Sequence, residues 1–504
     1  MRPLATIALV LLLALCGCSF GGSPDAAAKR PKRPHVVLLV LDEFPGDTLL
    51  GPGGRIDAGR FPHFAALADD STWFRNAHTS YDSTTKATPL ILDGIRPHPG
   101  TAPIARDHPQ SIFTALGTRG YRIVTSEEAT AMCPARYCPS ERRRRPAIIP
   151  NLKGGRAERF GQFIRSIHAS RRPTLWMKHA LLPHGPWIYL PSGRRSRPDG
   201  PELLPGMQTV PGFYDQYVTD HNEQRYLLQL GFVDRLLGRL VARLKSQGMY
   251  DDTVIVVTAD HGFAWQVGVP TRRSVTQSNV NELGPVPLFV KAPSQTRGRV
   301  NDALAQTLDV TPTIADVLNV PLGYRTDGRS AFSRGVRARR QVSLPKRDFS
   351  SIVRMSAGRW KAQRRALVRR RLRQLGSGDW ASLYTSLGPH RELIGDDVTS
   401  ARSSRGTRAT ISLSHSFSRV RRSTGVVPCQ IAGRIHDSGA ARERDLAVAV
   451  NGRIEAVGRS FHLKGETAEG YAVMVPEDAL RDGRNTVEVL EVTDDGEMVL
   501  LARS

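Results

Sequence analysis

Two short polar clusters, each placed directly after an apolar run, hold the residues of this chain best suited to chemistry. Asp42-Glu43 follows the run 35–41, and Asp260-His261 follows the run 254–259. Runs of this length, rich in valine, isoleucine and leucine, are typical of strands buried in a parallel sheet. Carboxylate oxygens are the ligands that hard divalent ions prefer. The two segments therefore predict metal ligands at the points where two buried strands end.

The elements that must position these residues lie between residues 35 and 330, where strand-like and helix-like patterns alternate. Strands are expected at Val36–Leu41, Tyr121–Thr125, Thr174–His179, Thr253–Thr258 and Val286–Val290. Helices are expected at Phe61–Ala68, Pro109–Leu116, Arg156–Ile167, Asn222–Gln247 and Thr311–Leu318. This order predicts an α/β fold, a sandwich around a mostly parallel sheet, with ligands gathered at the carboxyl ends of the strands.

Beyond a catalytic domain over 35–335, the chain divides by composition. The connecting segment 336–400 is strongly basic, and within 337–373 we expect a solvated helix packed against the α/β part in preference to a membrane-binding helix. Residues 400–407 are polar and suggest a linker. Short alternating runs separated by Asn-Gly and Asp-Gly turns predict a small all-β module, a sandwich, over 408–504.

The first residues indicate export. An apolar run from Leu4 to Leu15 precedes Cys16-Gly-Cys18, which is the layout of a secretory signal. Residues 1–18 resemble a bacterial lipoprotein signal, with Cys18 as the lipidated residue and 19–34 as a basic linker. An uncleaved anchor and an ordinary cleaved signal are the alternatives. The lipoprotein version places the protein on the outer face of the cytoplasmic membrane or elsewhere in the cell envelope.

Charge and cysteine content agree with that location. The formal net charge is +24, which favours anionic partners. For an exported chain these are an anionic membrane lipid or a cell-wall polymer, and a nucleic-acid role is excluded. Export also makes a disulfide between Cys133 and Cys138 the expected state of these two residues, since a metal site would need more ligands than they supply.

Several motifs, taken in order, carry a resemblance to a known family. They are VLDE at 40–43, DSTT at 82–85 followed by PLILDG at 89–94, HALLPHGPW at 179–187, TADHG at 258–262, VPLFV at 286–290 and DVTPTI at 309–314. Together they resemble the sulfatase-like branch of the alkaline phosphatase superfamily over residues 35–330. The resemblance implies an alkaline-phosphatase-like fold and one divalent metal.

Carried over to this chain, the resemblance implies a specific ligand set. Asp42, Glu43, Thr84, Asp260 and His261 would hold the ion. Oxygen ligands with one imidazole suit Mn or Mg best, with Ca as a further option, whereas Zn prefers more nitrogen.

Thr84 is the expected nucleophile, because it precedes Gly94 by the spacing that the family keeps between the nucleophile and a helix-end glycine. A metal and a helix N-terminus would both favour its alkoxide. Thr85 and Ser83 are the near alternatives, and Asp82 and Ser83 would also serve as helix caps.

The sequence departs from formylglycine sulfatases at this point. Those enzymes modify a Cys or Ser within Cys/Ser-x-Pro-x-Arg, and threonine cannot give the aldehyde. Residues 84–88 read TTKAT, without the proline or the arginine of that motif. A threonine nucleophile resembles the lipoteichoic-acid-synthase and phosphoethanolamine-transferase branches, in which the threonine carries a covalent phospho-intermediate.

A single metal is expected. Two-metal members of the superfamily need a further histidine well after the Asp-His pair, yet no histidine lies between His261 and His390. Asp220-His221 lacks such a partner and is interpreted as structural or substrate-contacting. Charge on the substrate would then be neutralised by side chains: His179 and His184 as catalytic candidates, with Lys178, Arg272 and Arg273 as substrate-binding candidates behind them.

The leading hypothesis is a metal-dependent exoplasmic phosphotransferase or phosphodiesterase. Thr84 would attack a phospholipid headgroup or cell-envelope polymer, and a histidine would protonate the departing alcohol. Phosphatidylglycerol is the expected donor. One alternative is a hydrolase of sulfate or simple phosphate esters. The other is a surface protein that binds polyanionic polymer without catalysis.

Overall fold

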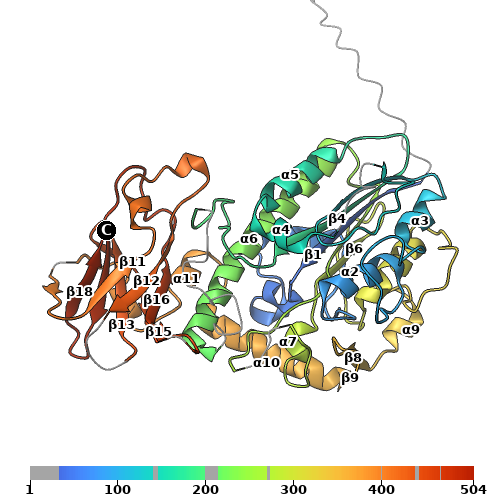
Figure 1. Ribbon diagram of the computed structural model, residues 1–504. Helices are drawn as coiled ribbons and strands as arrows, with labels where there is room; N and C mark the ends of the chain where they lie inside the picture. The colour runs from blue at the N-terminus through green and yellow to red at the C-terminus, as the bar shows by residue number, and fades with distance from the viewer. Residues whose placement is uncertain are drawn as a thin grey trace, which may run out of the picture.

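The chain forms a larger α/β part and a smaller all-β part that lie side by side (Figure 1). The computed structural model describes residues 33–139, 146–198, 214–268, 273–398, 400–436, 442–465 and 467–504. The predicted signal with Cys18, most of the basic linker and the substrate-binding candidate Arg272 lie outside these residues.

A seven-stranded sheet is the centre of the α/β part. Its strands are β1 (His35–Asp42), β2 (Thr72–Phe74), β3 (Arg122–Glu127), β4 (Thr174–Pro183), β5 (Thr253–Ala259), β6 (Leu288–Lys291) and β7 (Arg299–Asn301), in the order β3-β4-β1-β5-β6-β2-β7. β3, β4, β1 and β5 run parallel, while β6 is antiparallel to both of its neighbours. Every residue of β1, β4 and β5 is buried, as continuous apolar runs predict for strands covered on both faces.

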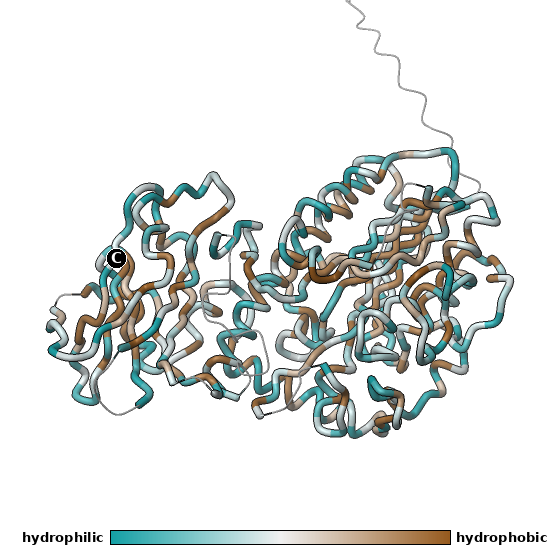
Figure 2. The backbone as a smooth tube through the Cα atoms, viewed as in Figure 1, coloured by the Kyte–Doolittle hydropathy of each residue, from teal (hydrophilic) through white to brown (hydrophobic). Residues whose placement is uncertain are grey.

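Helices cover both faces of this sheet, and the brown interior of Figure 2 follows its strands. α5 (Arg156–Ser166) and the long α6 (Gln216–Ser246) pack beside β4, while α2 (Thr84–Asp93), α3 (Ile112–Gly117) and α8 (Val310–Val317) lie on the other side (Figure 1). α1 (Pro62–Asp69) packs on α6, and the short α4 (Ile148–Lys153), α7 (Val280–Leu283) and α9 (Arg334–Arg337) lie in connections. The predicted α/β sandwich around a mostly parallel sheet is confirmed.

α6 begins earlier than the sequence predicted. The expected start was Asn222, but the helix starts at Gln216, because the Asp215 side chain accepts a hydrogen bond from the backbone of Val218 over 2.7 Å. That bond satisfies one of the free N–H groups of the first turn. The extra residues carry Tyr217 towards the all-β part, where its ring lies 6.4 Å from that of Phe461.

The basic segment after the sheet contains more than the expected helix. The helix is α10 (Ala357–Leu375), and its buried Trp360 and Arg364 fix it to the α/β part, as predicted. The residues before it instead form a hairpin of β8 (Gln341–Pro345) and β9 (Ile352–Ser356). Inward Val342, Leu344, Val353 and Met355 alternate with polar residues there, so the pattern has the period of a strand.

The C-terminal part consists of two packed sheets. One has the order β10-β18-β17-β13-β14 and the other β11-β12-β16-β15. Their bounds are β10 Arg402–Ser403, β11 Arg408–Ile411, β12 Gln430–His436, β13 Asp445–Val450, β14 Arg453–Arg459, β15 Phe461–His462, β16 Glu469–Met474, β17 Val487–Val492 and β18 Met498–Arg503. The all-β expectation is met, but β10 lies inside the expected linker 400–407 and pairs with β18.

Two further features bear on the sequence-based expectations. Cys133 and Cys138 are joined by a disulfide bond, as export was expected to favour. Within the described ranges, no helix combines the length and apolar character needed to cross a bilayer.

Candidate active site

The carboxyl ends of β1 and β5 bring the two acidic clusters together. The strands run parallel and in register, from His35 opposite Thr253 to Leu41 opposite Ala259, so the residues that follow them meet at one edge of the sheet. The Glu43 amide donates to Asp260 Oδ1 over 3.2 Å, and the Phe44 amide donates to the His261 carbonyl over 2.8 Å. These bonds fix the two loops to each other at the site.

Thr84 is the first residue of α2, and its hydroxyl points at both clusters. Its Oγ1 donates to Asp42 Oδ1 over 3.4 Å and lies 3.3 Å from His261 Nε2. Gly94 caps the C-terminal end of α2, and its φ of 71° is the left-handed conformation that favours glycine at a helix end. The structure therefore brings the expected nucleophile to the expected ligands, at a helix N-terminus.

Asp42, Asp260 and His261 fit a divalent cation. One ligand atom from each lies within 4.8 Å of the others, and all three side chains are buried. Asp42 Oδ2 and Asp260 Oδ2 are buried without a hydrogen-bond partner among the described residues. Two adjacent buried carboxylates with free oxygens are unfavourable unless a positive charge binds between them.

The pKa values of Asp42 and Asp260 are both raised, as expected for two buried carboxyl groups without a positive charge between them. Burial, and then the neighbouring Asp260, hold the pKa of Asp42 well above its usual range. Burial raises the pKa of Asp260 to about 7. His261 is oriented for metal binding, because its Nδ1 lies 2.7 Å from the Gly262 carbonyl. That contact places the proton on Nδ1 and leaves Nε2 as the electron-pair donor facing Thr84.

Glu43 lies in the same site, but its carboxylate is already paired. Its side chain forms an ion pair with Arg273, and the Arg273 guanidinium also donates to His184 Nε2 over 2.9 Å. Glu43 has a φ of 57°, an uncommon conformation for a residue with a side chain. Its predicted role as a metal ligand stays a prediction, since the structure shows it in a Glu43-Arg273-His184 group beside the triad of candidate metal ligands Asp42, Asp260 and His261.

The two catalytic histidine candidates occupy different positions. His179, on β4, is fully buried, and its Nε2 lies 4.0 Å from Asp260 Oδ2. His184 follows β4, and its Nδ1 lies 2.6 Å from the Gly185 carbonyl, so Nε2 faces Glu43 at 3.6 Å. Both border the site, with His184 nearer the Arg273 side chain, which is 34% exposed.

Lys178 does not point into the site. Its ammonium pairs with Glu128 and donates to Ser126 Oγ over 2.9 Å, and the whole side chain is buried. Successive residues of a strand face opposite sides of the sheet, so Lys178 and His179 cannot both face the same ligand. The predicted substrate contact of Lys178 is therefore corrected to a buried ion pair.

Arg347, in the β8–β9 turn, is a site residue that the sequence analysis missed. Its Nη2 donates to the Asp82 carbonyl over 2.6 Å, and its Nε lies 3.6 Å from Asp82 Oδ1. Asp82 also accepts from the Val275 amide over 2.9 Å, so it joins the start of α2 to two other segments. It does not cap α2 as suggested, and Ser83, at the cap position, makes no capping bond through its side chain.

Asp220 and His221 are not part of this site. Both belong to α6, where the His221 ring stacks on Tyr217 at 6.4 Å. Burial lowers the pKa of His221 to about 3, so this imidazole is neutral. The surroundings favour the structural interpretation of the pair over substrate contact.

Comparison with known proteins identifies a family and several relatives of this chain. The Sulfatase family model matches residues 34–320. The chain is 24% identical to the extracellular sulfatase SULF-1 homolog of Drosophila melanogaster, over 61% of this chain but 32% of that protein. It is 34% identical to the multifunctional alkaline phosphatase superfamily protein PehA of Trinickia caryophylli, over 19% of each. It is 24% identical to the choline-sulfatase of Rhizobium meliloti, over 65% of this chain and 78% of that protein. The chain thus spans about a third or less of the first two relatives.

Proposed function

The chain belongs to the sulfatase family, and from that premise we propose that it acts on phosphodiesters through Thr84. The observation that carries the proposal is the position of the Thr84 hydroxyl, at the start of α2 and within 3.4 Å of Asp42 and His261. Threonine cannot become formylglycine, so the step open to this residue is direct attack by its own oxygen.

The residues would divide the reaction as follows. A divalent cation held by Asp42, Asp260 and His261, with Thr84 and Glu43 as further candidate ligands, would lower the pKa of the Thr84 hydroxyl and neutralise charge on the phosphoryl oxygens. Thr84 Oγ1 forms the new bond to phosphorus as the bond to the leaving alcohol breaks. Asp42, to which the hydroxyl already donates over 3.4 Å, would accept the Thr84 proton.

Arg273 and the histidines near the triad would act on the phosphoryl oxygen and on the leaving group of the substrate. Arg273 is partly exposed and reaches towards the site, so it is placed to bind an anionic oxygen. His184, or His179 deeper in the site, would return a proton to the departing alkoxide. The Thr84 phosphodiester formed in this step keeps the second alcohol of the substrate. Its alkylphosphoryl group would then pass to a glycan hydroxyl, which is transfer, or to water, which is hydrolysis, and either step frees Thr84.

Sulfate-ester hydrolysis is the competing function, favoured by two of the relatives being named sulfatases. The two functions separate on one panel of bis(p-nitrophenyl) phosphate, p-nitrophenyl phosphate and p-nitrophenyl sulfate. The proposal expects turnover of the diester with Mn or Mg, its loss in Thr84→Ala, and near-normal turnover in Thr85→Ala, the matched neighbour on α2. Cleavage of the aryl sulfate alone would establish the competing function.

The location and natural substrate are a further part of this proposal. The signal-like residues 1–18 and the net charge of +24 support a protein anchored through Cys18 on an anionic membrane surface, with phosphatidylglycerol or a cell-wall polymer as substrate. Globomycin, which blocks lipoprotein signal cleavage, should leave a heavier precursor. Cys18→Ala should release the protein from the membrane fraction.

A further inference from the structure

A groove with a volume of about 470 Å³ runs between α10 and the segment that follows β1. One wall is α10, with Lys361, Arg365 and Arg369 facing the groove. The other wall includes η2 (Pro52–Gly54), a short turn with two glycines. This groove is not part of the site described above, since none of the triad residues lines it.

The charges that line the groove do not balance. Its two acidic residues are already neutralised: Asp47 by the buried Arg364, with Nε to Oδ2 at 2.8 Å, and Asp302 by Arg75, with Nη2 to Oδ2 at 2.8 Å. Lys361, Arg365 and Arg369 remain, and within the described part of the chain no carboxylate pairs with them. Lys361 makes only a 3.4 Å contact to the Asp302 carbonyl.

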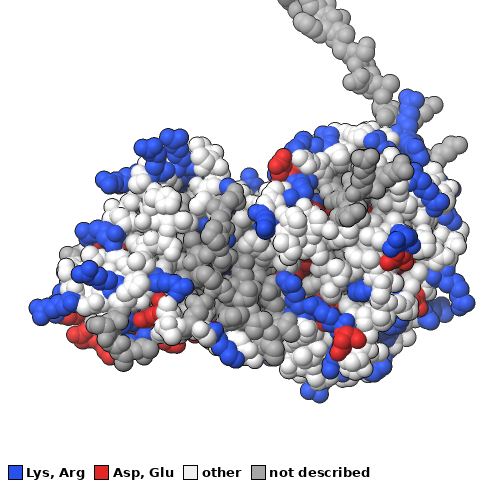
Figure 3. All heavy atoms as spheres, in the orientation of Figure 1, with Lys and Arg blue, Asp and Glu red and all other residues white. Residues whose placement is uncertain are grey.

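The three cations form a row on a rigid support. They are four residues apart on a helix, so they lie on one face about 6 Å from one to the next. The adjacent face of α10 is anchored by the buried Trp360, Arg364 and Val368, and the Arg364 guanidinium lies 4.2 Å from the centre of the Trp360 ring. Because the helix cannot turn away, the row keeps facing the groove. Positive side chains are numerous on the visible face of the molecule (Figure 3). Lys361, Arg365 and Arg369 differ from a scattered surface charge because they line a cavity.

The facing wall leaves space for an extended ligand. Gly53 and Gly54 have φ values of 72° and 69°, and a Cβ at either position would meet no atom within 4 Å. No side chain therefore projects from Gly53 or Gly54, and the space beside them is empty of protein atoms. A chain with anionic groups spaced by roughly one helical turn would satisfy all three cations, whereas a single small anion would contact one or two.

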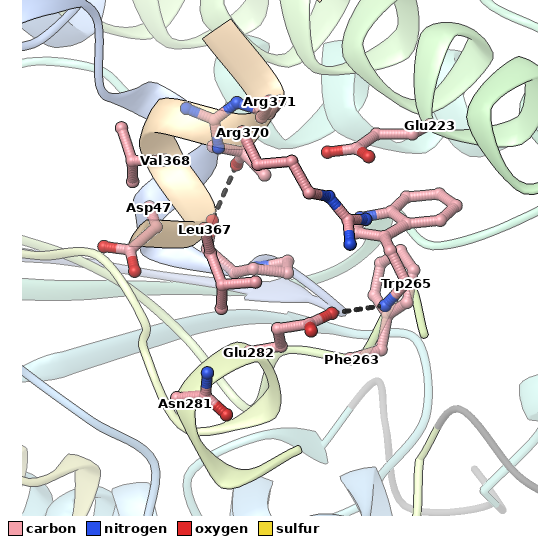
Figure 4. Close-up of a pocket in the computed structure, with 12 residues that line it drawn as sticks. Asp47, Glu223, Phe263, Trp265, Asn281, Glu282, Leu367, Val368, Arg370 and Arg371 are labelled. Atoms are coloured by element: carbon pink, nitrogen blue, oxygen red, sulfur yellow. Dashed lines mark hydrogen bonds between the residues drawn. The ribbon is translucent and has the colours of Figure 1, made fainter. Parts of the chain in front are cut away.

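The groove adjoins a smaller cavity of about 50 Å³ that reaches the loop after His261. Figure 4 shows Val368, Arg370 and Arg371 of α10 on one side of it, with Phe263 and Trp265 on the other. Asp47 and Val368 line both cavities. A polymer in the groove would therefore lie alongside the segment that carries the candidate active site.

We propose that this groove binds a polyanionic chain, a glycan or similar polymer that carries repeated sulfate or phosphate groups. The binding is separate from the ester chemistry and does not depend on it. A flexible polymer bound next to the site would raise its local concentration there. The row Lys361, Arg365 and Arg369 supplies the contacts, and the glycine turn supplies the space.

The test is equilibrium binding of the full-length chain to fluorescent dextran sulfate and to inorganic polyphosphate of matched length, with uncharged dextran as reference. Arg365→Gln with Arg369→Gln should weaken binding roughly tenfold. It should also reduce the slope of log K against log salt by about 1.4, by analogy with single-stranded polyanions. The control, Arg354→Gln with Arg359→Gln, removes two exposed arginines that do not line the groove, and should leave both values near wild type.

Each outcome decides the proposal. Preference for dextran sulfate or for polyphosphate identifies which oxyanion the groove takes. An equal loss in both double variants would mean that overall charge is responsible, and would overturn the proposal. So would binding of dextran sulfate and of polyphosphate that is no tighter than the binding of uncharged dextran. Turnover of a small aryl ester should be the same in all variants, so a failure of the catalytic proposal leaves the binding result interpretable.

Discussion

Asp260→Asn is the substitution that best examines the buried carboxylate pair. In the metal-free protein, burial raises the pKa of Asp260 to about 7, against an ordinary value of 3.8. The folded state thus holds this proton more tightly than the unfolded state does. The free energy of unfolding therefore falls as pH rises from about 4 to about 7, by at most about 4 kcal/mol, and stays low above that range.

Asparagine cannot ionise, so the variant lacks this loss. Its Oδ1 can still accept from the Glu43 and His261 amides, which lie 3.2 and 2.6 Å from that oxygen in the wild type. Removing one charge also relieves Asp42. Without metal, we expect the variant to be more stable than the wild type at pH 8, by up to about 4 kcal/mol, and nearly equal to it at pH 4.

Metal should reduce the difference in stability between the two proteins. The wild type at neutral pH gains about 2.7 kcal/mol at a metal concentration of one hundred times Kd, and the variant should gain much less because a ligand is missing. Urea unfolding of the wild type and of Asp260→Asn at pH 4 and pH 8, with EDTA or with Mn, measures these free energies of unfolding. A variant that is no more stable than the wild type at pH 8 in EDTA would refute the reasoning, and so would equal stabilisation of both proteins by Mn.

Three further predictions concern separate parts of the molecule. Lys178→Met leaves Glu128 buried without its ammonium partner. It should lower the free energy of unfolding by about 3 kcal/mol in urea titrations, while kcat of the folded enzyme stays unchanged. An unchanged free energy of unfolding would contradict the ion pair. Arg347→Gln should raise KM for an anionic diester roughly tenfold with a smaller effect on kcat, and unaltered steady-state kinetics would remove it from the site. Cys133→Ser with Cys138→Ser should lower the free energy of unfolding by about 2 kcal/mol, and equal thermal melts of variant and wild type would count against a stabilising bridge.

Much of the sheet could be predicted because its strands are buried on both faces. Apolar runs without alternation identified β1, β4 and β5, and the rule that ligands gather at carboxyl ends then placed Asp42 near Asp260. The short β2 and β7 were missed, since strands of three residues carry too little pattern. The antiparallel direction of β6 likewise follows from tertiary packing that no local pattern encodes.

The site was predictable where its residues belong to local motifs. Thr84 was found through its spacing to Gly94, which the start and end of α2 explain. Arg347 gave no such signal, because it reaches Asp82 only when the β8–β9 hairpin folds back across the chain. Lys178 was misplaced although the information was present: strand alternation separates it from His179.

The most direct measurement of the central claim is the intact mass of the protein after incubation with Mn and phosphatidylglycerol vesicles, beside Thr84→Ala. The account predicts an adduct of the mass of glycerophosphate less one water on the wild type alone, with peptide fragmentation placing it on Thr84, together with release of diacylglycerol. The same adduct on Thr84→Ala, or diacylglycerol released by that variant at the wild-type rate, would contradict it.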